Sequence, residues 1–488
     1  MKIVSDMQAV HGAQLGGTAC YTSCTYSYLS RARVLVQTLR AAHPDWSIWV
    51  VIVDLPPPGV DVGPVLAEFD GVVAAQDLPI PNFRRWLFKH NIVEACTAVK
   101  ACMLRHLLAL GFDKIVYLDP DIAVFKSLAM VEQRLDRGSI VLTPHQIEPN
   151  DDRIAIADNE LTSMKYGIFN LGFIAVRNDK TGNGFAVWWD RMLQAACYED
   201  IEVGIFTDQK YCDLVPALFD HVQIERDPGC NVASWNISRR FVEITREGDI
   251  TVNGSPLKFY HFTKIGSVGD VMMERYADDN PAVFDIWSWY RRAITTSAIV
   301  DIPKGYWYYG RFSNEVSISD EIRRFYRNRD DLMAAFADPF DCEAGSFFDW
   351  LGKNEPELLS GAAKEPKSLS HTRPAPGSPP SDVDTDMSVD KDWYLAVNPD
   401  VADAVRTGIC ASALDHYLRI GMREGRLPAY ITVDEDFYLA AYPDVKGAIS
   451  SGDIESAQAH FGHHGYKEGR QAYPGHSPWV PRNARAIK

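Results

Sequence analysis

Residues 113–125 read DKIVYLDPDIAVF, and this stretch decides the predicted fold. Residues 115–118 form a short apolar run bounded by charge, which predicts a buried strand and not a helix. Pro120 fixes its own φ and biases Asp119 toward extended geometry, so the strand ends there. Asp119 and Asp121 therefore stand at the carboxyl edge of the strand, which is where ligands bind in an open α/β sheet.

These neighbouring carboxylates repel each other unless a cation lies between them. A hard divalent ion with oxygen ligands is the simplest occupant of such a site. Asp and Pro are also common after strands for backbone reasons alone. The tripeptide leaves both a metal site and a simple turn open.

Composition narrows the class of protein. The 488 residues suffice for two or three domains, and a hydrophobic share of 46% can fill a large core. A net charge of −16 argues against a nucleic-acid partner. Nine scattered cysteines without a paired CxxC pattern indicate reduced, buried thiols in the cytoplasm. We expect no signal peptide and no transmembrane segment. Peripheral attachment to the inner membrane face and homo-oligomer formation are left open.

The chain before the aspartates alternates between strand and helix patterns. Residues 19–25 and 48–53 predict strands, and residues 28–42 and 94–110 predict helices. This order is typical of a mononucleotide-binding α/β half. Tyr28, at the first strand-to-helix turn, either stacks on a base or packs internally. Lys100, early in the second helix, either faces an anionic ligand or lies on a solvated surface.

Three later stretches carry polar side chains in apolar surroundings. Asn170 interrupts the strand-like run GIFNLGFIAV at 167–176, and a buried amide without partners costs about 1–3 kcal/mol. Asn170 therefore bonds either the backbone of a bulge, which Gly172 would suit, or ligand hydroxyls. Asp208 and Gln209 precede a helical run, where they act as an N-cap or hold sugar hydroxyls. His261 ends an aromatic strand and is either a core residue or a third metal ligand.

Taken in order, these motifs resemble a known family. They are YLxxA at 28–32, TAVK at 97–100, YLDPD at 117–121, FNLG at 169–172, DQ at 208–209, NVASWN at 231–236 and HF at 261–262. The set resembles bacterial nucleotide-sugar glycosyltransferases with the GT-A fold, nearest to the family 8-like group of lipopolysaccharide galactosyltransferases and glycogenin. The likeness covers roughly residues 18–275. It implies a Rossmann-like mixed α/β sheet flanked by helices.

The resemblance also implies roles for residues. Asp119, Asp121 and His261 would hold Mn²⁺ or Mg²⁺ against the donor diphosphate. The donor contacts would be Thr22, Tyr28, Lys100, Asp119, Asn170 and Lys264. Asp208 and Gln209 would be the catalytic pair beside the anomeric carbon in a retaining transfer. Two stretches depart from the family pattern: residues 24–27 (CTYS) lack the usual acidic base-reading residue, and TKIG at 263–266 replaces the usual continuation after the histidine.

The composition predicts further segments on either side of the catalytic domain. We expect a flexible N-terminus at 1–17, the catalytic domain at 18–280 and an aromatic-rich helical extension at 281–351. The extension completes the core, and its aromatic residues are also candidates for shaping the acceptor side. Residues 352–389 are rich in Pro, Ser and Asp and predict a linker. Two 44-residue helical repeats at 390–474 and a tail at 475–488 follow.

The two repeats share a spaced pattern. WYLA, PDV, HY and GxxEGR in the first copy return as FYLA, PDV, HF and GxxEGR in the second. Each copy predicts an all-α unit, similar to small repeats appended to bacterial surface-polysaccharide glycosyltransferases. Arg426 and Arg470 either brace each unit by pairing with the nearby acids, at 400 or 424 and at 444 or 468, or bind an acceptor chain, a partner or a second subunit.

The expected activity is a metal-dependent glycosyl transfer. A hexose would move from a nucleotide diphosphate sugar, with UDP as the expected carrier, to a surface polysaccharide, lipopolysaccharide or related glycolipid. One alternative is a sugar nucleotidyltransferase, although residues 20–33 lack a Gly-rich phosphate loop. Another is a scaffold that binds glycan or protein through the repeats.

Overall fold

The computed structural model of the protein describes residues 16–277, 280–362, 390–406, 413–417, 421, 426–451, 454–466, 468 and 470–474. The chain divides into two compact units, Met1–Ser378 and Pro379–Lys488, and each is described by itself. The flexible N-terminus predicted at 1–17 lies outside the described residues apart from its last two positions. The predicted tail lies entirely outside them.

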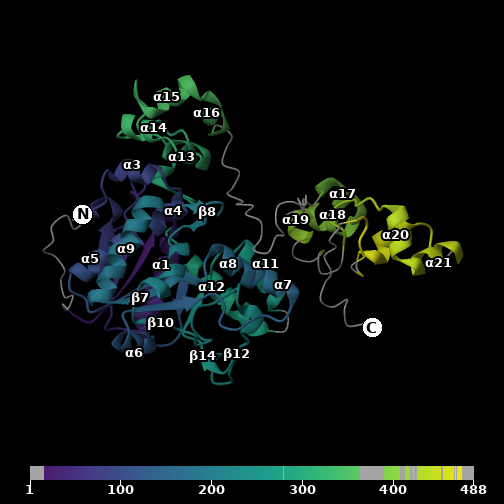
Figure 1. The fold of residues 1–488 in the computed structure, drawn as a ribbon, viewed down its shortest axis with the longest axis horizontal. Coiled ribbons are helices and arrows are strands. Elements are labelled where there is room, and N and C mark those ends of the chain that lie inside the picture. The colour runs from purple at the N-terminus through teal and green to yellow at the C-terminus, as the bar shows by residue number, and fades with distance from the viewer. Residues whose placement is uncertain are drawn as a thin grey trace. The chain divides into compact units, whose positions relative to one another are not determined.

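A seven-stranded mixed sheet forms the centre of the first unit (Figure 1). Its order is β10 (Val222–Ile224), β6 (Ile140–Pro144), β7 (Phe169–Arg177), β4 (Lys114–Leu118), β1 (Thr18–Cys24), β2 (Ser47–Ile52) and β3 (Gly71–Ala74). Strand β7 runs antiparallel to both of its neighbours, and the other pairs are parallel. The predicted α/β class and mixed sheet are confirmed.

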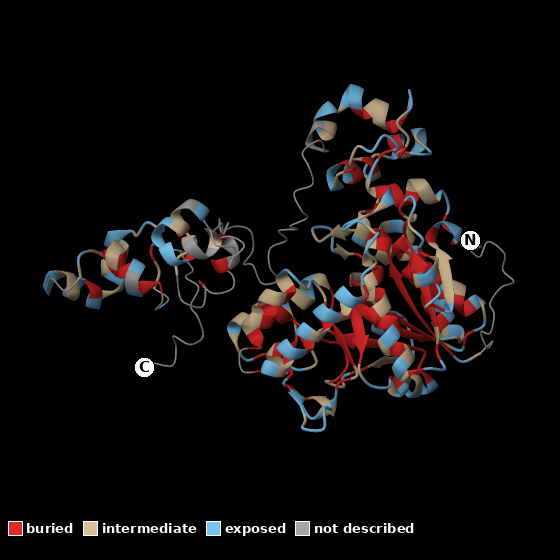
Figure 2. Cartoon of the chain, turned by 180° about the vertical axis from the view of Figure 1, so that it is seen from behind, coloured by how far each residue is buried: buried red, intermediate tan, exposed pale blue. Residues whose placement is uncertain are grey.

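Both faces of the sheet are covered, which explains why its strands are apolar without alternation. Tyr21, Val51 and Tyr117 belong to a core cluster on one face. Val50 and Val116 belong to the cluster on the other. Figure 2 shows the strands as a buried layer between helices. The helices include α1 (Leu29–Ala42), α6 (Ala129–Arg137) and α9 (Lys180–Ala196).

The single helix predicted at 94–110 is two helices. Helix α4 (Ile92–Ala98) begins with a capping box between Asn91 and Glu94, and α5 (Lys100–Ala109) follows after one residue. The hydroxyl of Thr97 donates to the carbonyls of Val93 and Glu94, 3.0 Å from each. Such back-bonding competes with the helical ladder and bends or ends helices. Lys100 consequently opens its own helix.

A small second sheet joins distant parts of the chain. Strand β5 (Ile122–Val124) directly follows the aspartates, and β15 (Phe259–His261) pairs with it antiparallel. Strand β11 (Val232–Ala233) lies along the other edge of β15. The register sets His261 opposite Ile122, one residue after Asp121. This pairing decides the geometry of the candidate site.

Helices after residue 267 complete the first unit. They are α11 (Val268–Tyr276), α12 (Pro281–Thr296), α13 (Asp320–Arg327), α14 (Asp330–Ala335), α15 (Phe347–Asn354) and α16 (Pro356–Ala362). Trp287 and Tyr290 are core residues, and the Tyr290 ring stacks on Phe262 with centroids 3.8 Å apart. Buried Arg323 donates to the carbonyls of Phe88 and Tyr309, which ties the extension to the sheet domain.

The first part of the segment predicted as a linker is largely helical. Residues 352–354 belong to α15 and residues 356–362 to α16, where apolar Leu358 and Leu359 pack against the core. The proline-rich part of the predicted linker lies outside the described residues.

The second unit repeats one arrangement. Helices α17 (Lys391–Val397), α18 (Pro399–Arg406) and α19 (Ala413–His416) correspond to α20 (Glu435–Ala441), α21 (Pro443–Ser451) and α22 (Ala457–His460). In both copies a tyrosine hydroxyl meets a histidine Nδ1, at 3.2 and 3.0 Å. Arg426 pairs with Asp400, and Arg470 with Asp444 and Glu468. The bracing role of both arginines is confirmed, whereas Glu424 lies outside the described residues.

Candidate active site

The two aspartates form the corner between the large and the small sheet. Strand β4 ends at Leu118, and the backbone N–H of Asp119 donates to the Gly172 carbonyl at 2.8 Å. The N–H of Ile122 donates to the Asp119 carbonyl at 3.0 Å and closes the turn. Asp121 is buried, whereas the side chain of Asp119 is 25% exposed. The chain therefore carries one covered and one accessible carboxylate at the edge of the sheet.

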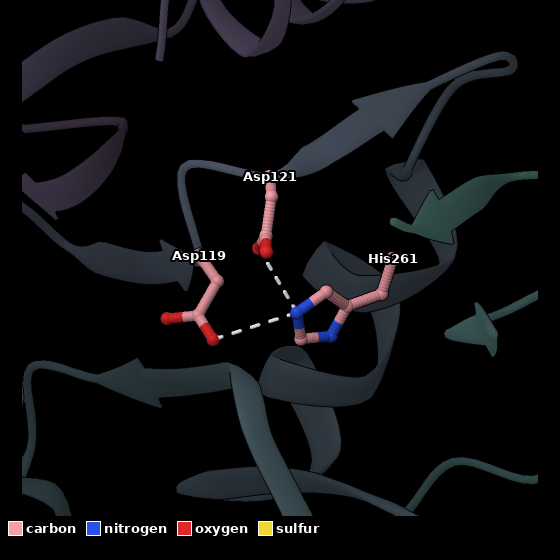
Figure 3. A group of neighbouring side chains, drawn as sticks. All are labelled: Asp119, Asp121 and His261. Carbon is pink, nitrogen blue, oxygen red and sulfur yellow. Dashed lines mark ion pairs between the residues drawn. The ribbon is translucent and has the colours of Figure 1, made fainter. Parts of the chain in front are cut away.

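His261 meets both carboxylates (Figure 3). Its Nε2 lies 3.0 Å from Asp121 Oδ1 and 3.6 Å from Asp119 Oδ2. One ligand atom from each of the three residues lies within 4.8 Å of the others, which suits a single divalent cation. Burial disfavours the imidazolium, yet the two aspartates raise the pKa of His261 above its usual value. The imidazole thus faces strong negative charge.

The opposite side of the imidazole is fixed by Asn170. His261 Nδ1 lies 3.2 Å from Asn170 Oδ1, which also accepts from Gly172 N at 3.2 Å and from Asn231 Nδ2 at 3.1 Å. When Nδ1 carries the proton and donates it to Asn170 Oδ1, the lone pair is on Nε2, which is then the atom able to bind a metal ion. A Cβ on Gly172 would lie 2.4 Å from His261 Cε1, so the glycine makes room for the ring. Asn170 bonds the backbone, as one of its alternatives predicts, and also orients the histidine.

Lys100 lies behind the aspartates and is buried. Its ammonium lies 3.1 Å from Asp119 Oδ1 and 2.8 Å from Asp208 Oδ2, and it donates to the Leu171 carbonyl at 3.0 Å. Burial opposes the charge, but Asp119 and Asp208 raise the pKa of Lys100 above its usual value. All three donors of the ammonium are directed at protein oxygens. The solvated-face alternative for Lys100 is wrong.

Asp208 and Gln209 follow strand β9 (Ile205–Phe206) at a strained turn. Thr207 has a φ of 43°, and its hydroxyl lies 3.1 Å from Asp208 Oδ1. Gln209 Oε1 accepts from Leu171 N at 3.2 Å, and its Nε2 donates to the Tyr166 carbonyl at 3.1 Å. Neither side chain caps the following 3-10 helix η4 (Lys210–Leu214). The N-cap alternative is wrong, because Asp208 pairs with Lys100 instead.

The remaining predicted donor contacts lie at different distances from the aspartates. The Tyr28 hydroxyl lies 3.4 Å from Asp121 Oδ2. Lys264 is exposed three residues after His261, with a φ of 52°. Thr22 is a buried β1 residue that pairs with Val50, two positions before the strand ends. Tyr28 is therefore part of the candidate site. Lys264 lies three residues beyond His261 along the chain, and Thr22 lies within the large sheet.

The chain shows limited similarity to known proteins. No protein-family model matches the chain. An uncharacterized protein of Bacillus subtilis, YfnF, is 27% identical over 208 residues, which span 40% of this chain and 65% of the relative. The chain therefore matches somewhat less than two thirds of that relative's length.

Several solved glycosyltransferases align with part of the chain at low similarity. The galactosyltransferase LgtC, solved with donor and acceptor sugar analogues, aligns at 14% identity and a TM-score of 0.36, covering 59% of this chain and 98% of LgtC. Mouse xyloside xylosyltransferase 1 aligns at 11% identity and a TM-score of 0.32, covering 51% and 98%. The bifunctional WbbM aligns at 14% identity and 0.31, covering 46% and 41%. At this similarity the site has to be interpreted from its own residues.

Two residues of the site were missed by the sequence interpretation. Tyr117 donates to Asp119 Oδ1 at 2.6 Å, and its ring centroid lies 4.3 Å from the Lys100 ammonium. A spacing of two along a strand places Tyr117 and Asp119 on one side, so this signal was available. The Arg31 guanidinium covers the Tyr28 ring at 4.2 Å. Its position follows from the one-turn spacing on α1, but nothing in the sequence marks it as part of the site.

Proposed function

We propose that the chain is a metal-dependent glycosyltransferase that moves a hexose from a nucleotide diphosphate sugar to a glycan or glycolipid acceptor. The observation that carries this proposal is the convergence of Asp119, Asp121 and His261 at the carboxyl edge of β4. We infer UDP as the carrier and a surface polysaccharide or lipopolysaccharide as the acceptor from the ordered motifs. Retention of the anomeric configuration belongs to the same proposal.

The three residues fit Mn²⁺ or Mg²⁺. Two carboxylates and one imidazole are a donor set that suits Mn²⁺, and the carboxylates also suit Mg²⁺. The Asn170 contact to His261 Nδ1 supports the fit, because metal-binding imidazoles are normally oriented by such a partner. A divalent cation bound there would neutralise charge on the departing nucleoside diphosphate.

The buried pairing of Lys100 supports the proposed positions of two acids. Lys100 holds Asp119 and Asp208 on either side of one ammonium. Burial raises the pKa of Asp208, and the nearby ammonium opposes that rise. Gln209 lies next to Asn170, because its Oε1 accepts from Leu171 N on β7 at 3.2 Å and from Asn170 Nδ2 at 3.4 Å, and Asp208 directly precedes it. We assign this pair to the side of the anomeric carbon, where a carboxylate or amide oxygen favours an oxocarbenium-like transition state.

The strand-to-helix turn after β1 disfavours the nucleotidyltransferase alternative. It consists of Thr25 and the 3-10 helix η1 (Tyr26–Tyr28), without a glycine. A triphosphate-binding loop needs several backbone N–H groups that approach phosphates closely, which glycines permit. Release of pyrophosphate from a nucleoside triphosphate would favour that alternative over the glycosyltransferase.

The proposal can be tested by nucleotide-sugar binding and turnover. The full chain is screened by thermal shift with a panel of UDP-, GDP- and ADP-sugars with Mn²⁺ or EDTA, because a ligand of the folded state raises its apparent stability. Donor hydrolysis or transfer is then measured for the best ligand. We expect one donor class to stabilise the protein only with Mn²⁺ and to be turned over.

Two variants make this test specific. Asp121→Ala should lose turnover, whereas Asp249→Ala, which removes an exposed carboxylate paired with Lys126, should keep it. Full turnover in EDTA or in Asp121→Ala would contradict the proposal.

A further inference from the structure

The charge around the proposed metal site leaves the donor diphosphate short of partners. Lys100 is occupied by Asp119 and Asp208, so its positive charge is already compensated. A divalent cation between Asp119 and Asp121 would likewise be balanced by two carboxylates. A nucleoside diphosphate brings further negative charge to the same place. Another cation on the outer side of Asp121 would therefore improve the electrostatic match.

Arg31 is a cation in the required place. It lies in the first turn of α1, where its guanidinium stacks over the Tyr28 ring with 4.2 Å between Cζ and the centroid. The hydroxyl of the same tyrosine lies 3.4 Å from Asp121 Oδ2. One side chain, Tyr28, thus contacts both Arg31 and the proposed metal ligand Asp121.

The charge of Arg31 is not balanced by a carboxylate among the residues that the structure describes. Within the described part of the chain no carboxylate forms an ion pair with it, unlike Arg33 and Arg40 on the same helix, which pair with Glu68 and Asp70. Its Nε is buried and has no hydrogen-bond acceptor. An unpaired buried donor costs free energy unless a ligand satisfies it.

A second unsatisfied group from a distant segment lies near the same residues. The Tyr290 hydroxyl of α12 is buried without a hydrogen-bond partner. Its ring stacks on Phe262, which follows the proposed ligand His261, and α12 packs against α1. Two unsatisfied polar groups, from α1 and α12, therefore lie near the candidate site.

We propose that Arg31 binds the donor diphosphate as a second cation beside the metal site and that Tyr28 positions its guanidinium. The planar fork of an arginine matches two phosphate oxygens, and stacking on an aromatic ring pre-orients it at small entropic cost. This inference rests on the proposed function. It assigns to α1 a specific part of the donor-binding work that the metal ligands do not perform.

The test measures binding and does not depend on turnover. Isothermal titration of the full chain with UDP, uridine and inorganic pyrophosphate, each with Mn²⁺, compares wild type, Arg31→Gln and Arg31→Lys. Arg40→Gln is the control, because it removes a cation from the same helix away from the site. Thermal melting without ligand checks that every variant is folded.

We expect Arg31→Gln to weaken UDP and pyrophosphate about 10-fold to 100-fold, as for a lost hydrogen bond between charged groups. Uridine affinity should not change, Arg31→Lys should be intermediate, and Arg40→Gln should match wild type. Wild-type UDP affinity in Arg31→Gln would overturn this inference and leave the proposed function intact. Failure of wild type to bind UDP and pyrophosphate would overturn both.

Discussion

The candidate site and the C-terminal repeats both use pairs of opposite charge, but in different surroundings. Around Lys100 the ammonium is 3% exposed and the Asp208 carboxylate 4%. In the second repeat Arg470 is 19% exposed and its partner Asp444 is 63% exposed. A buried side chain stays charged only when a partner compensates for its lost hydration, whereas an exposed charge is hydrated by water. The first network therefore depends on its internal pairing, whereas the second braces its fold from the surface.

Removing the buried cation should have the largest effect. Lys100→Met fills a similar volume but leaves Asp119 and Asp208 as uncompensated neighbours of like charge. Breaking a buried pair by removing one partner costs about 3–5 kcal/mol, so the free energy of unfolding of the first unit should fall by that amount at pH 7. Urea denaturation followed by tryptophan fluorescence measures it. A loss below about 1 kcal/mol would show that the network is solvated like a surface pair.

A buried acid without a cation extends the comparison to pH. Asp54 is 5% exposed, and its Oδ1 accepts from the N–H groups of Leu55, at 3.0 Å, and Tyr308, at 2.8 Å. Burial raises the pKa of Asp54 to about 7. The folded state thus holds this proton more tightly than the unfolded state, and the stability it contributes is lost as pH rises from about 4 to 7.

Replacing this acid should remove that part of the pH dependence. As the pH rises from about 4 to 8, the stability of Asp54→Asn relative to wild type should increase by about 2–4 kcal/mol. One unit of pKa shift corresponds to about 1.4 kcal/mol. Denaturation at several pH values gives the difference directly, because other groups titrate in both proteins. Parallel stability curves for the two proteins would refute the assigned cause.

The close approach at Gly172 gives a smaller, more local effect. Gly172→Ala places a methyl group against His261, so the ring must shift and stability should fall by about 1–3 kcal/mol. Gly184, a helical glycine of α9 with nothing within 4 Å of its added Cβ, is the matched control. Gly184→Ala should be neutral or slightly stabilising. Equal melting temperatures for the two variants would count against a tight fit of the imidazole.

The exposed pairs of the repeats should give the smallest effect. Asp444→Asn removes one of the two acidic partners of Arg470 and leaves Glu468, and exposed pairs contribute about 0–1 kcal/mol. Thermal unfolding of the full chain should show a small shift of the repeat unit that disappears in 1 M salt. A loss comparable with that of Lys100→Met would mean that the repeat depends on this pair for its fold.

The sequence predicts the elements of the site better than their contacts. The apolar run before Asp119 and the isolated His261 are local signals, and the structure places them together as expected. The break between α4 and α5 at Val99 was missed because it depends on the hydrogen bonds of the Thr97 hydroxyl to the backbone. These bonds depend on the rotamer of Thr97, which the sequence does not specify. The helices within residues 352–362 were missed because residues 352–389, taken together, are polar and rich in proline. Leu358 and Leu359 in this segment nevertheless pack on the core.

Long-range contacts explain the rest of the difference. Asn170 and His261 meet only because β15 pairs with β5, and no local pattern encodes the register of strands more than 130 residues apart. Gly172 was read as suited to a bulge. The register bears this out: opposite Leu142 and Pro144, β7 carries extra residues between Phe169 and Ile174, and Gly172 lies among them and also makes room for the histidine. No described helix is long and apolar enough to span a membrane.

The most direct measurement is a titration of the full chain with Mn²⁺. Binding is monitored by the electron paramagnetic resonance signal of the free ion and by calorimetry. The account predicts one Mn²⁺ site per chain in wild type and the loss of this site in both Asp121→Asn and His261→Gln, with unchanged binding in Asp249→Ala. Binding of Mn²⁺ that is equally tight in all four proteins, or absent from wild type, would contradict it.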